Sequence, residues 1–360
     1  MRNNNCTLFI GLSLVALLIG CSGSVSKPPA LKLLEVKRSA CLRIQADALL
    51  DGIAEYYQPI GSERVYFLSP ERFTLHQLDV NNGKIRLVTI IPNLPYFNAF
   101  SVNERKQEVT VYTDDSVVIY NWTGKHLEAY SYNGLSDEGY LVAINRLFLP
   151  VTKNGKQYVH YFSNEKKSYK DPHFFQKPLE AEWDPTTNKV QLIPQVYPSN
   201  FQQYCYGYNY LADRIEIDAL THGYTFPYND SIFFCNIKTG KRSSKFFGSY
   251  AGKKFKHIRY DEIPTLHESV FDQLVAENPY YMFTRNFPLA GYYTRLLLFQ
   301  PTEKNPKVQQ HLVIFDREFN YVLETKPPFN PNVLVDSKKG LLSMEYSLKD
   351  HVLILDRLSW

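Results

Sequence analysis

The chain lacks the short motifs that identify most enzymes and metal proteins. Its nine histidines form no His-x-x-His or His-x-x-x-His pair, and its five cysteines form no Cys-x-x-Cys pair. A zinc site built from neighbouring ligands is therefore excluded. There is no Gly-x-Ser-x-Gly elbow, phosphate-binding loop or dinucleotide fingerprint either. We predict no catalytic residue, no metal and no cofactor, although ligands that converge from distant segments stay open.

The chain also has no long apolar run and no strong excess of one charge. The longest apolar stretch, from Leu8 to Ile19, is too short to span a bilayer as a helix. Lysine and arginine number 40 against 36 acidic residues, which gives a formal net charge of +4. This near-neutral balance argues against a general nucleic-acid binder.

The N-terminus instead has the order of a secretory signal: a basic Arg2, the apolar stretch, and a small residue before a cleavage point. Its ending, Leu18-Ile-Gly-Cys21, resembles the lipobox of bacterial lipoproteins. That resemblance implies that residues 1–20 are a signal peptide and that Cys21 is acylated. Residues 21–36 would then form the lipidated N-terminus and a tether, followed by the folded domain over residues 37–360. An ordinary cleaved signal with an incidental cysteine is the alternative.

The residues around Cys21 also bear on location. Two or more acyl chains anchor a protein firmly to a membrane. Ser22, rather than Asp, follows the cysteine, which in such lipoproteins points to the outer membrane of the cell envelope. Because no acidic cluster of the surface-export type follows, we expect the periplasmic face.

Three cysteines remain once Cys6 is removed and Cys21 is lipidated, namely Cys41, Cys205 and Cys235. An odd number allows at most one intramolecular disulfide. Cys235 lies in an apolar run and is expected to be a small buried hydrophobe. Pairing of Cys205 with either of the others stays open.

The rest of the chain favours β-strands, because it is rich in β-branched and aromatic residues, including 27 Tyr and 23 Phe. A strand-turn-strand unit recurs six times. Its turn begins with Asp or Asn, and Gly or Asn usually follows three or four residues later: Asp79/Gly83, Asn121/Gly124, Asp184/Asn188, Asn236/Gly240, Asp316/Asn320, and Asp356 at the end. The first side chain can accept backbone N–H groups, and the second residue can adopt the left-handed conformation.

The spacing of these units predicts a ring of blades. The shortest intervals, about forty residues, suit one four-stranded propeller blade. Because the last unit runs into the C-terminus, its outer strand has to come from residues 43–50 or those just before them. The longest interval holds a helix signal over residues 265–278, with a capping box from Thr265 to Glu268 and a stop at Asn278-Pro279.

These hairpins behind a lipobox resemble the six-bladed β-propeller lipoproteins of Bacteroidota, a family of unknown function. The resemblance implies an all-β fold, a six-bladed β-propeller of four-stranded antiparallel blades with one short helical insert. It implies no catalytic residue. A β-sandwich pair is the alternative fold.

Two aromatic segments are candidate ligand-binding sites. Alternation on a strand would place Tyr204, Tyr206, Tyr208 and Tyr210 on one face, where they could stack on sugar rings or peptide side chains. Packing between blades is the alternative interpretation.

The second segment contains Arg285, Tyr292 and Arg295 among other aromatic residues. An arginine can stack on an aromatic ring and also bind a carboxylate, so these residues would form an anion-binding funnel if their strands line the channel. Amphipathic strands with exposed arginines are the alternative. The basic run 253–259 is expected to be a solvated blade edge, with contact to anionic lipid as the other interpretation.

The sequence therefore favours a membrane-anchored envelope lipoprotein that acts as a binding or scaffold propeller for a peptide, glycan or partner protein. A membrane contact through lipidated Cys21 is expected, and a nucleic-acid partner is not. The alternative is an envelope hydrolase or lyase that acts on a sugar or lactone at the mouth of the channel.

Overall fold

A computed structural model describes most of the chain after the N-terminal segment. The described residues are 35–46, 55–132, 135, 140–143, 150–153, 155–163, 169–208, 210–251, 253–301, 306–331, 333–347, 349–350 and 352–360. The predicted signal peptide, Cys21 and nearly all of the tether lie outside these residues. The side chain of Cys41 does too.

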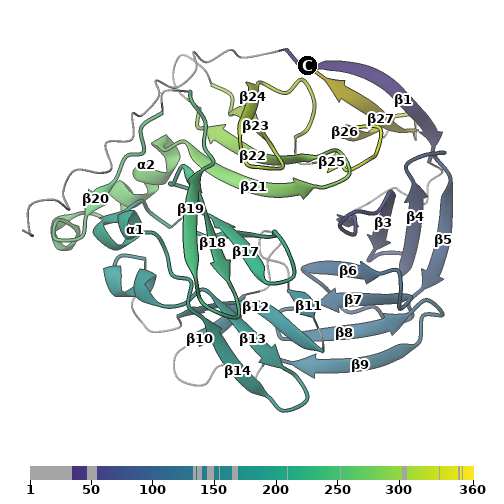
Figure 1. Ribbon diagram of the computed structural model, residues 1–360, viewed down its shortest axis with the longest axis horizontal. Helices are drawn as coiled ribbons and strands as arrows, with labels where there is room; N and C mark the ends of the chain where they lie inside the picture. The colour runs from purple at the N-terminus through teal and green to yellow at the C-terminus, as the bar shows by residue number, and fades with distance from the viewer. Residues whose placement is uncertain are drawn as a thin grey trace, which may run out of the picture. The chain divides into compact units, whose positions relative to one another are not determined.

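The chain folds as a six-bladed β-propeller of antiparallel sheets, as predicted, and Figure 1 shows the sheets arranged around a central axis. From the axis outward, the first three blades consist of β2 (Glu55–Tyr57), β3 (Arg64–Ser69), β4 (Thr74–Asp79) and β5 (Ile85–Ile90); β6 (Ala99–Asn103), β7 (Glu108–Tyr112), β8 (Ser116–Asn121) and β9 (His126–Ser131); and β10 (Tyr140–Ala143), β12 (Lys156–Ser163), β13 (Glu180–Asp184) and β14 (Lys189–Ile193), with β11 (Val151–Lys153) also paired to β12.

The other three blades have the same order of strands. They consist of β16 (Asp213–Glu216), β17 (Thr221–Thr225), β18 (Ser231–Asn236) and β19 (Arg242–Phe246); β21 (Tyr280–Phe287), β22 (Tyr292–Phe299), β23 (Gln309–Asp316) and β24 (Tyr321–Thr325); and β25 (Leu334–Val335), β26 (Leu342–Ser347), β27 (Val352–Ser359) and β1 (Lys37–Gln45).

The predicted turns join the third and fourth strands of the first five blades. In each, the side chain of the leading Asp or Asn accepts a hydrogen bond from the backbone N–H two residues ahead, at 2.8–3.1 Å. The left-handed residue is the predicted one in four blades: Gly83, Gly124, Asn188 and Gly240. In the fifth blade the prediction of Asn320 is wrong, because Phe319 takes this conformation with φ 61°.

The N-terminal strand closes the ring, as predicted. β1 pairs antiparallel with β27 from Lys37↔Ser359 to Gln45↔Val352 and forms the outer strand of the sixth blade. The prediction of a turn at Asp356 is wrong, because Asp356 lies within β27, which runs on to Ser359. Its side chain instead forms an ion pair with Arg38, which also pairs with Glu345 at 2.8 Å. The last blade therefore combines both ends of the chain, which excludes the β-sandwich alternative.

The hydrophobic core is divided among the six interfaces between blades, with one buried cluster at each. Between the sixth and first blades, for example, Ile44 and Leu355 pack with Phe67 and Leu78. Strands in the middle of the blades, such as β3, β22 and β23, are almost entirely buried, which explains their nearly continuous apolar runs. The outer strands β9 and β19 are mostly exposed and carry charged and polar side chains, which protect a sheet edge from pairing with another chain.

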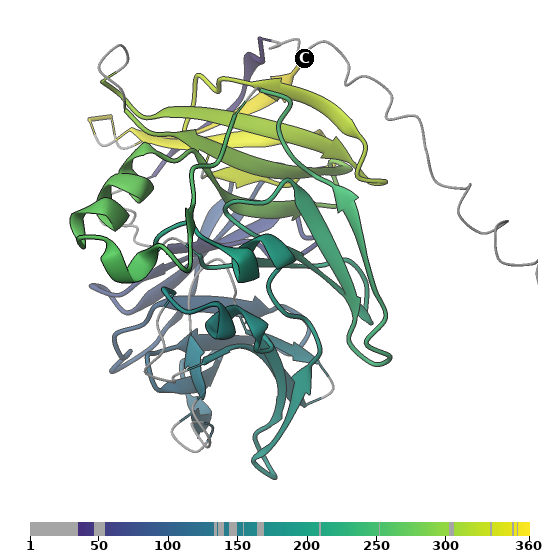
Figure 2. The same cartoon turned by 90° about the vertical axis from the view of Figure 1, so that its left-hand side faces the viewer.

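Two long connections flank the fourth blade and carry the helices. The first, between β14 and β16, contains α1 (Ser199–Gln203) and β15 (Tyr204–Cys205), while the 3-10 helix η2 (Pro172–Gln176) lies in the loop between β12 and β13 of the third blade. The second contains β20 (Ile258–Arg259), the 3-10 helix η3 (Ile263–Thr265) and α2 (Ser269–Glu277). β15 pairs with β20, so the two connections form one small layer. Figure 2 shows α2 at the outside of the propeller strands.

The predicted helix exists but starts later than expected. The capping box does not form, because Thr265 ends a 3-10 turn and its hydroxyl donates to the carbonyl of Glu262 at 2.8 Å. α2 begins only at Ser269, without a side-chain cap. It ends as predicted at Asn278, whose buried side chain also bonds the backbone of Lys256.

Candidate functional site

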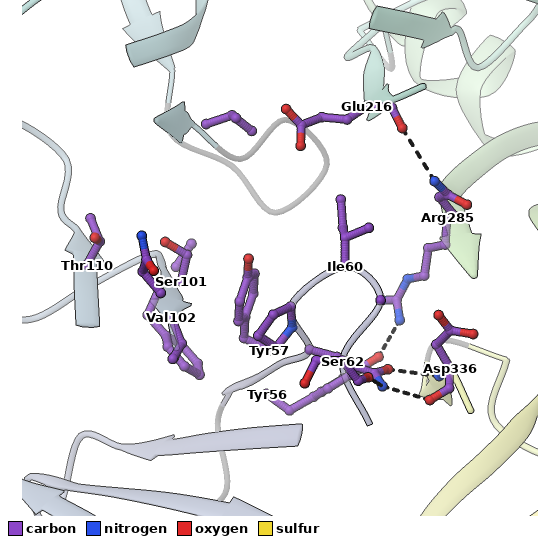
Figure 3. A pocket seen from close by; sticks show the side chains of 18 of the residues that line it. Tyr56, Tyr57, Ile60, Ser62, Ser101, Val102, Thr110, Glu216, Arg285 and Asp336 are labelled. Atoms are coloured by element: carbon purple, nitrogen blue, oxygen red, sulfur yellow. Dashed lines mark hydrogen bonds between the residues drawn. The ribbon is translucent and has the colours of Figure 1, made fainter. Parts of the chain in front are cut away.

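The axis of the propeller is hollow, with a cavity of about 1650 Å³. The innermost strands β2, β6, β16 and β21 line it, together with β11 and the segment around β25. The lining combines aromatic rings with charged groups, and Figure 3 shows representative side chains that point into this channel. It is a wide site, since cavities that hold drug-sized ligands are about 300–1,000 Å³.

A β-bulge in β21 directs Arg285 into the channel. The register of β21 against β22 shifts by one residue between Met282 and Arg285, and Phe283 adopts φ 52°. A bulge re-aims the side chains that follow it, and a left-handed conformation is costly for a bulky residue. The bulge is held in place because the backbone N–H of Thr284 donates to Asp213 Oδ2 at 2.7 Å.

Arg285 lies against aromatic rings. Its guanidinium carbon is 5.6 Å from the ring centroid of Tyr56 and 5.8 Å from that of Phe283, and the guanidinium donates a hydrogen bond to the Tyr56 hydroxyl (Figure 3). Among the described residues, no carboxylate is in ion-pair contact with Arg285. A ligand carboxylate is the natural partner for such a stacked, planar cation.

The carboxylates of the channel, by contrast, have partners within the protein. Four of them form ion pairs: Glu104 with Arg64 at 3.6 Å, Glu108 with Lys106 at 3.9 Å, Glu216 with Lys153 at 2.8 Å, and Glu345 with Arg38 at 2.8 Å. Asp336 accepts the backbone N–H groups of Leu289 and Ala290 at 2.9 and 2.8 Å. Arg285 is therefore the channel cation best placed to meet a ligand anion.

A loop and a tyrosine complete the channel wall next to Arg285. The Tyr57 ring is 5.9 Å from that of Phe100, and its hydroxyl has no hydrogen-bond partner among the described residues. In the loop that follows, Ile60 is 58 % exposed and points into the channel (Figure 3). Gln58 fixes the loop through two 2.8 Å hydrogen bonds with the backbone of Asp336.

A second, smaller cavity of about 260 Å³ lies between the fourth and fifth blades. Tyr208, Arg295 and Val275 of α2 are among its lining residues. Asp213 lines both this cavity and the channel. Burial raises the pKa of Asp213 to about 6, against the hydrogen bonds from Thr284 and the nearby charges of Arg295 and Arg285.

The predicted row of tyrosines does not form one face. β15 ends at Cys205, and Gly207 has φ 90°, so the alternation breaks. Tyr206 is buried and stacks on Tyr228 with ring centroids 4.9 Å apart, which is the packing role given as the alternative. Tyr204 is half-buried against His257, and Tyr208 is half exposed at the second cavity.

The second predicted segment is split between different places. Arg285 lines the channel, but the expectation that Arg295 would join it is wrong, because Arg295 lies on β22, is 1 % exposed and borders the second cavity. Tyr292 packs against the C-terminal Trp360, with ring centroids 5.2 Å apart.

Cys205 and Cys235 are buried free thiols, so they do not pair with each other.

The basic run 253–259 lies in the second long connection rather than at a blade edge, and most of its basic side chains are exposed as predicted, with Lys253 as the exception. The Lys253 side chain is 3 % exposed, pairs with Asp230 at 2.7 Å and lies over the Tyr281 ring at 4.8 Å. Lys256 pairs with Glu277 of α2, and Arg259 pairs with Asp261 at 2.8 Å. Of these three pairs, Lys253–Asp230 joins the second connection to the fourth blade, and the other two lie within that connection.

Sequence reasoning missed Tyr56, Tyr57, Asp213 and the loop at Ile60. Their local sequence is that of ordinary strand ends, and only the closure of the ring brings them together. Arg285 was found because a cation among aromatic residues is itself a signal.

The part of the chain that the structure describes contains no cluster of three or more His, Cys, Asp or Glu side chains able to hold a metal ion. It also contains no helix with the length and apolarity needed to cross a membrane.

Comparison with known proteins supports the fold. No protein-family model and no curated protein matches the chain. Among solved structures, a member of the DUF4221 family from Bacteroides vulgatus superposes with a TM-score of 0.68, at 15% identity, over 91% of this chain and 99% of its own. A putative exported protein from Bacteroides fragilis superposes with a TM-score of 0.52, at 9% identity, over 90% of this chain and 96% of its own. At these identities the likeness concerns the six-bladed propeller fold alone.

Proposed function

We propose that the protein is a cell-envelope lipoprotein, anchored through Cys21, whose propeller channel binds a ligand that carries a carboxylate. A peptide with a free C-terminus, an acidic glycan or a segment of a partner protein would present this group. The observation that carries the proposal is Arg285, a stacked cation in the channel that has no carboxylate partner among the described residues.

Neighbouring groups around Arg285 could contact the rest of a ligand whose carboxylate is bound by the arginine. Tyr57 offers a ring face and an unbonded hydroxyl, and Ile60 offers an exposed apolar side chain beside it. Aromatic area with a few fixed polar groups is typical of ligand sites. The acidic side chains of the channel, each with its own partner, would disfavour anions elsewhere on the wall and so direct the carboxylate to Arg285.

The experiment is a binding titration of the purified protein. The panel contains matched pairs: peptides with free or amidated C-termini, and oligosaccharides with or without uronic acids. We expect the carboxylate member of at least one pair to bind, and Arg285→Ala to weaken that binding roughly tenfold or more. Arg285→Lys keeps the charge but loses the planar stacked fork, so an intermediate loss is expected.

Arg242→Ala is the matched control, because Arg242 is exposed on the outer strand β19, away from the channel. It should leave the affinity unchanged. Equal binding of free and blocked ligands, or an Arg285→Ala protein that binds as tightly as the wild type, would contradict the proposal.

The anchor is tested separately by fractionation of the cell envelope. Cys21→Ala removes the acylation site, so the protein should leave the membrane fraction and no longer incorporate labelled fatty acid. The exported protein from Bacteroides fragilis, which shares the fold, supports an envelope location. The alternative of an envelope hydrolase or lyase rests on the sequence alone.

A further inference from the structure

The lining of the channel is mainly acidic, although the site proposed for the ligand carboxylate is a cation. Among the described residues, six acidic and three basic ones line the cavity. Of the basic ones, Arg214 is paired with buried Glu180, and the Lys106 side chain is 64 % exposed. An anion that enters the channel therefore meets mostly like charges outside the neighbourhood of Arg285.

Four of the acidic side chains keep one oxygen free for a ligand. Glu104 and Glu216 make their ion pairs through Oε1, whereas Glu108 and Glu345 make theirs through Oε2. The other oxygen of each carboxylate is accessible and has no partner among the described residues. The four side chains are 24–35 % exposed. Each of them can therefore accept a hydrogen bond from a donor outside the protein.

These carboxylates are spread around the ring rather than gathered in one cluster. Glu104 follows β6 of the second blade, Glu216 ends β16 of the fourth, and Glu345 lies on β26 of the sixth. Figure 3 shows the Glu216 carboxylate and the Tyr57 ring pointing into the channel. Burial raises the pKa of the Tyr57 hydroxyl, and the charges of Glu216 and Glu104 raise it further. Glu216 and Glu104 therefore face the same space from two blades.

Glu216 lies next to Arg285 without neutralising it. The side chain of Asn286, the residue after Arg285, donates to the backbone carbonyl of Glu216 at 3.4 Å. The Glu216 carboxylate pairs instead with Lys153 at 2.8 Å and forms no ion pair with Arg285. A negative and a positive site thus adjoin on neighbouring blades. A ligand that carries a carboxylate and a cation close together can bind to both.

We propose that the carboxylate ligand of the channel is a short basic peptide with a free C-terminus. The inference rests on the proposed function, because the C-terminal carboxylate would bind Arg285. A lysine or arginine near that end would donate to the free oxygens of Glu216 and Glu104, in charge-assisted hydrogen bonds that are about twice as strong as neutral ones. An acidic glycan fits less well, since it brings only negative charges into an acidic channel.

The test is a calorimetric titration of the purified protein with short alanine-based peptides. The residue before the last is lysine, norleucine or glutamate, and each peptide has a free or an amidated C-terminus. Norleucine keeps the apolar stem of lysine but lacks its charge. Among the free peptides, the lysine one should bind roughly tenfold more tightly than the norleucine one, and the glutamate one most weakly. The advantage of lysine should shrink as salt is added, because salt screens exposed charges.

Two variants locate the bound cation. Glu216→Gln and Glu104→Gln each remove one charge and keep the shape of the side chain. Each should reduce the advantage of lysine over norleucine several-fold and leave the affinity for the norleucine peptide unchanged, which also shows that the variant is folded. Glu128→Gln is the matched control, because Glu128 is exposed on the outer strand β9, away from the channel. It should leave both affinities unchanged.

The outcomes separate this inference from the proposed function. If free peptides bind more tightly than amidated ones but lysine has no advantage over norleucine, the inference is overturned and the proposed function stands. An undiminished advantage of lysine in both glutamine variants would also overturn the inference, because the cation would then bind elsewhere. Binding of an oligosaccharide with a uronic acid and an amino sugar, and of no peptide, would overturn the inference alone. Equal binding of free and amidated peptides, or no binding of any peptide or glycan, would overturn both.

Discussion

Glu180 is a buried carboxylate at the interface of the third and fourth blades, and its charge is balanced by three neighbours. It accepts hydrogen bonds from Arg214 and the Tyr224 hydroxyl, and its Oε2 lies 2.8 Å from His222 Nδ1. Burial alone would raise the pKa of Glu180. Arg214 and His222, together with the hydrogen bonds, instead hold its pKa below the ordinary value. The carboxylate is thus ionised and part of one network with Arg214.

Glu180→Gln should destabilise the fold by about 3 kcal/mol or more, because it leaves the charge of Arg214 buried without its counter-charge. Urea unfolding measures the loss. Glu345→Gln is the matched control, since the Glu345–Arg38 pair is partly exposed and should contribute about 1 kcal/mol or less. If Glu180→Gln lost no more stability than Glu345→Gln, the buried Glu180–Arg214 pair would contribute no more to the fold than a partly exposed ion pair.

Asp213 should make the stability of the protein depend on pH in the opposite way to an ordinary ion-paired carboxylate. Its pKa is raised from 3.8 to about 6 by burial, so the folded state binds its proton more tightly than the unfolded state. Stability from this group is therefore complete below about pH 4 and falls by about 3 kcal/mol as the pH rises to about 6.

Urea unfolding of the wild type and of Asp213→Asn at several pH values between about 4 and 7 measures this effect. The variant should lack the decline that Asp213 causes. The two curves should therefore converge at low pH and separate as the pH rises. A constant difference between them would mean that Asp213 does not titrate in this range.

At the scale of the element, the turn residues were the most predictable feature of the chain. Asp79, Asn121 and Asn236 form their turns through bonds to nearby N–H groups, so the local sequence determines them. The capping box at Thr265 and the tyrosine row failed because packing of the two long connections overrode local preference. At Gly207, an added Cβ would lie only 2.4 Å from Val275 of α2, a contact that sequence does not reveal.

Gly124 should be much less replaceable than Gly61, although both have left-handed backbones, with φ of 76° and 74°. An alanine Cβ at Gly124 would lie 2.0 Å from the carbonyl oxygen of Ile90, whereas nothing lies within 4 Å of one at Gly61. Gly61→Ala should cost about 1 kcal/mol, the penalty of the conformation alone. Gly124→Ala should cost at least about 2 kcal/mol more, because backbone must move. Chemical unfolding compares the two, and equal losses would contradict the contact.

At the scale of the whole molecule, the repeated turns and a last unit that reaches the C-terminus without an outer strand predicted a ring closed by the N-terminal strand, although the turn predicted at Asp356 does not form. The channel could not be predicted in the same way. Tyr56, Asp213 and Arg285 belong to three blades, and no local pattern states that the innermost strands will face one another. Sequence identified the arginine by its chemistry, but its neighbours depend on how the blades close.

Removal of β1 should unfold the propeller as a unit. Without it, β27 keeps its pairing with β26 but loses the outer strand Lys37–Gln45, and Ile44 leaves the cluster that joins the sixth and first blades. A protein that begins at residue 35 should be as stable as the full-length chain. One that begins at residue 47 should lose cooperative thermal unfolding or aggregate. Two similar melting curves would show that the ring does not depend on this closure.

The pairing of Lys37 with Ser359 places the two ends of the propeller side by side, where the other five blades have a short turn. The break in the chain therefore occupies the position of a missing sixth turn. Joining these ends with a turn such as Asn-Gly, and opening the chain between any two blades, would give a circularly permuted protein with the same neighbours throughout. In topological terms, no blade is inherently first or last.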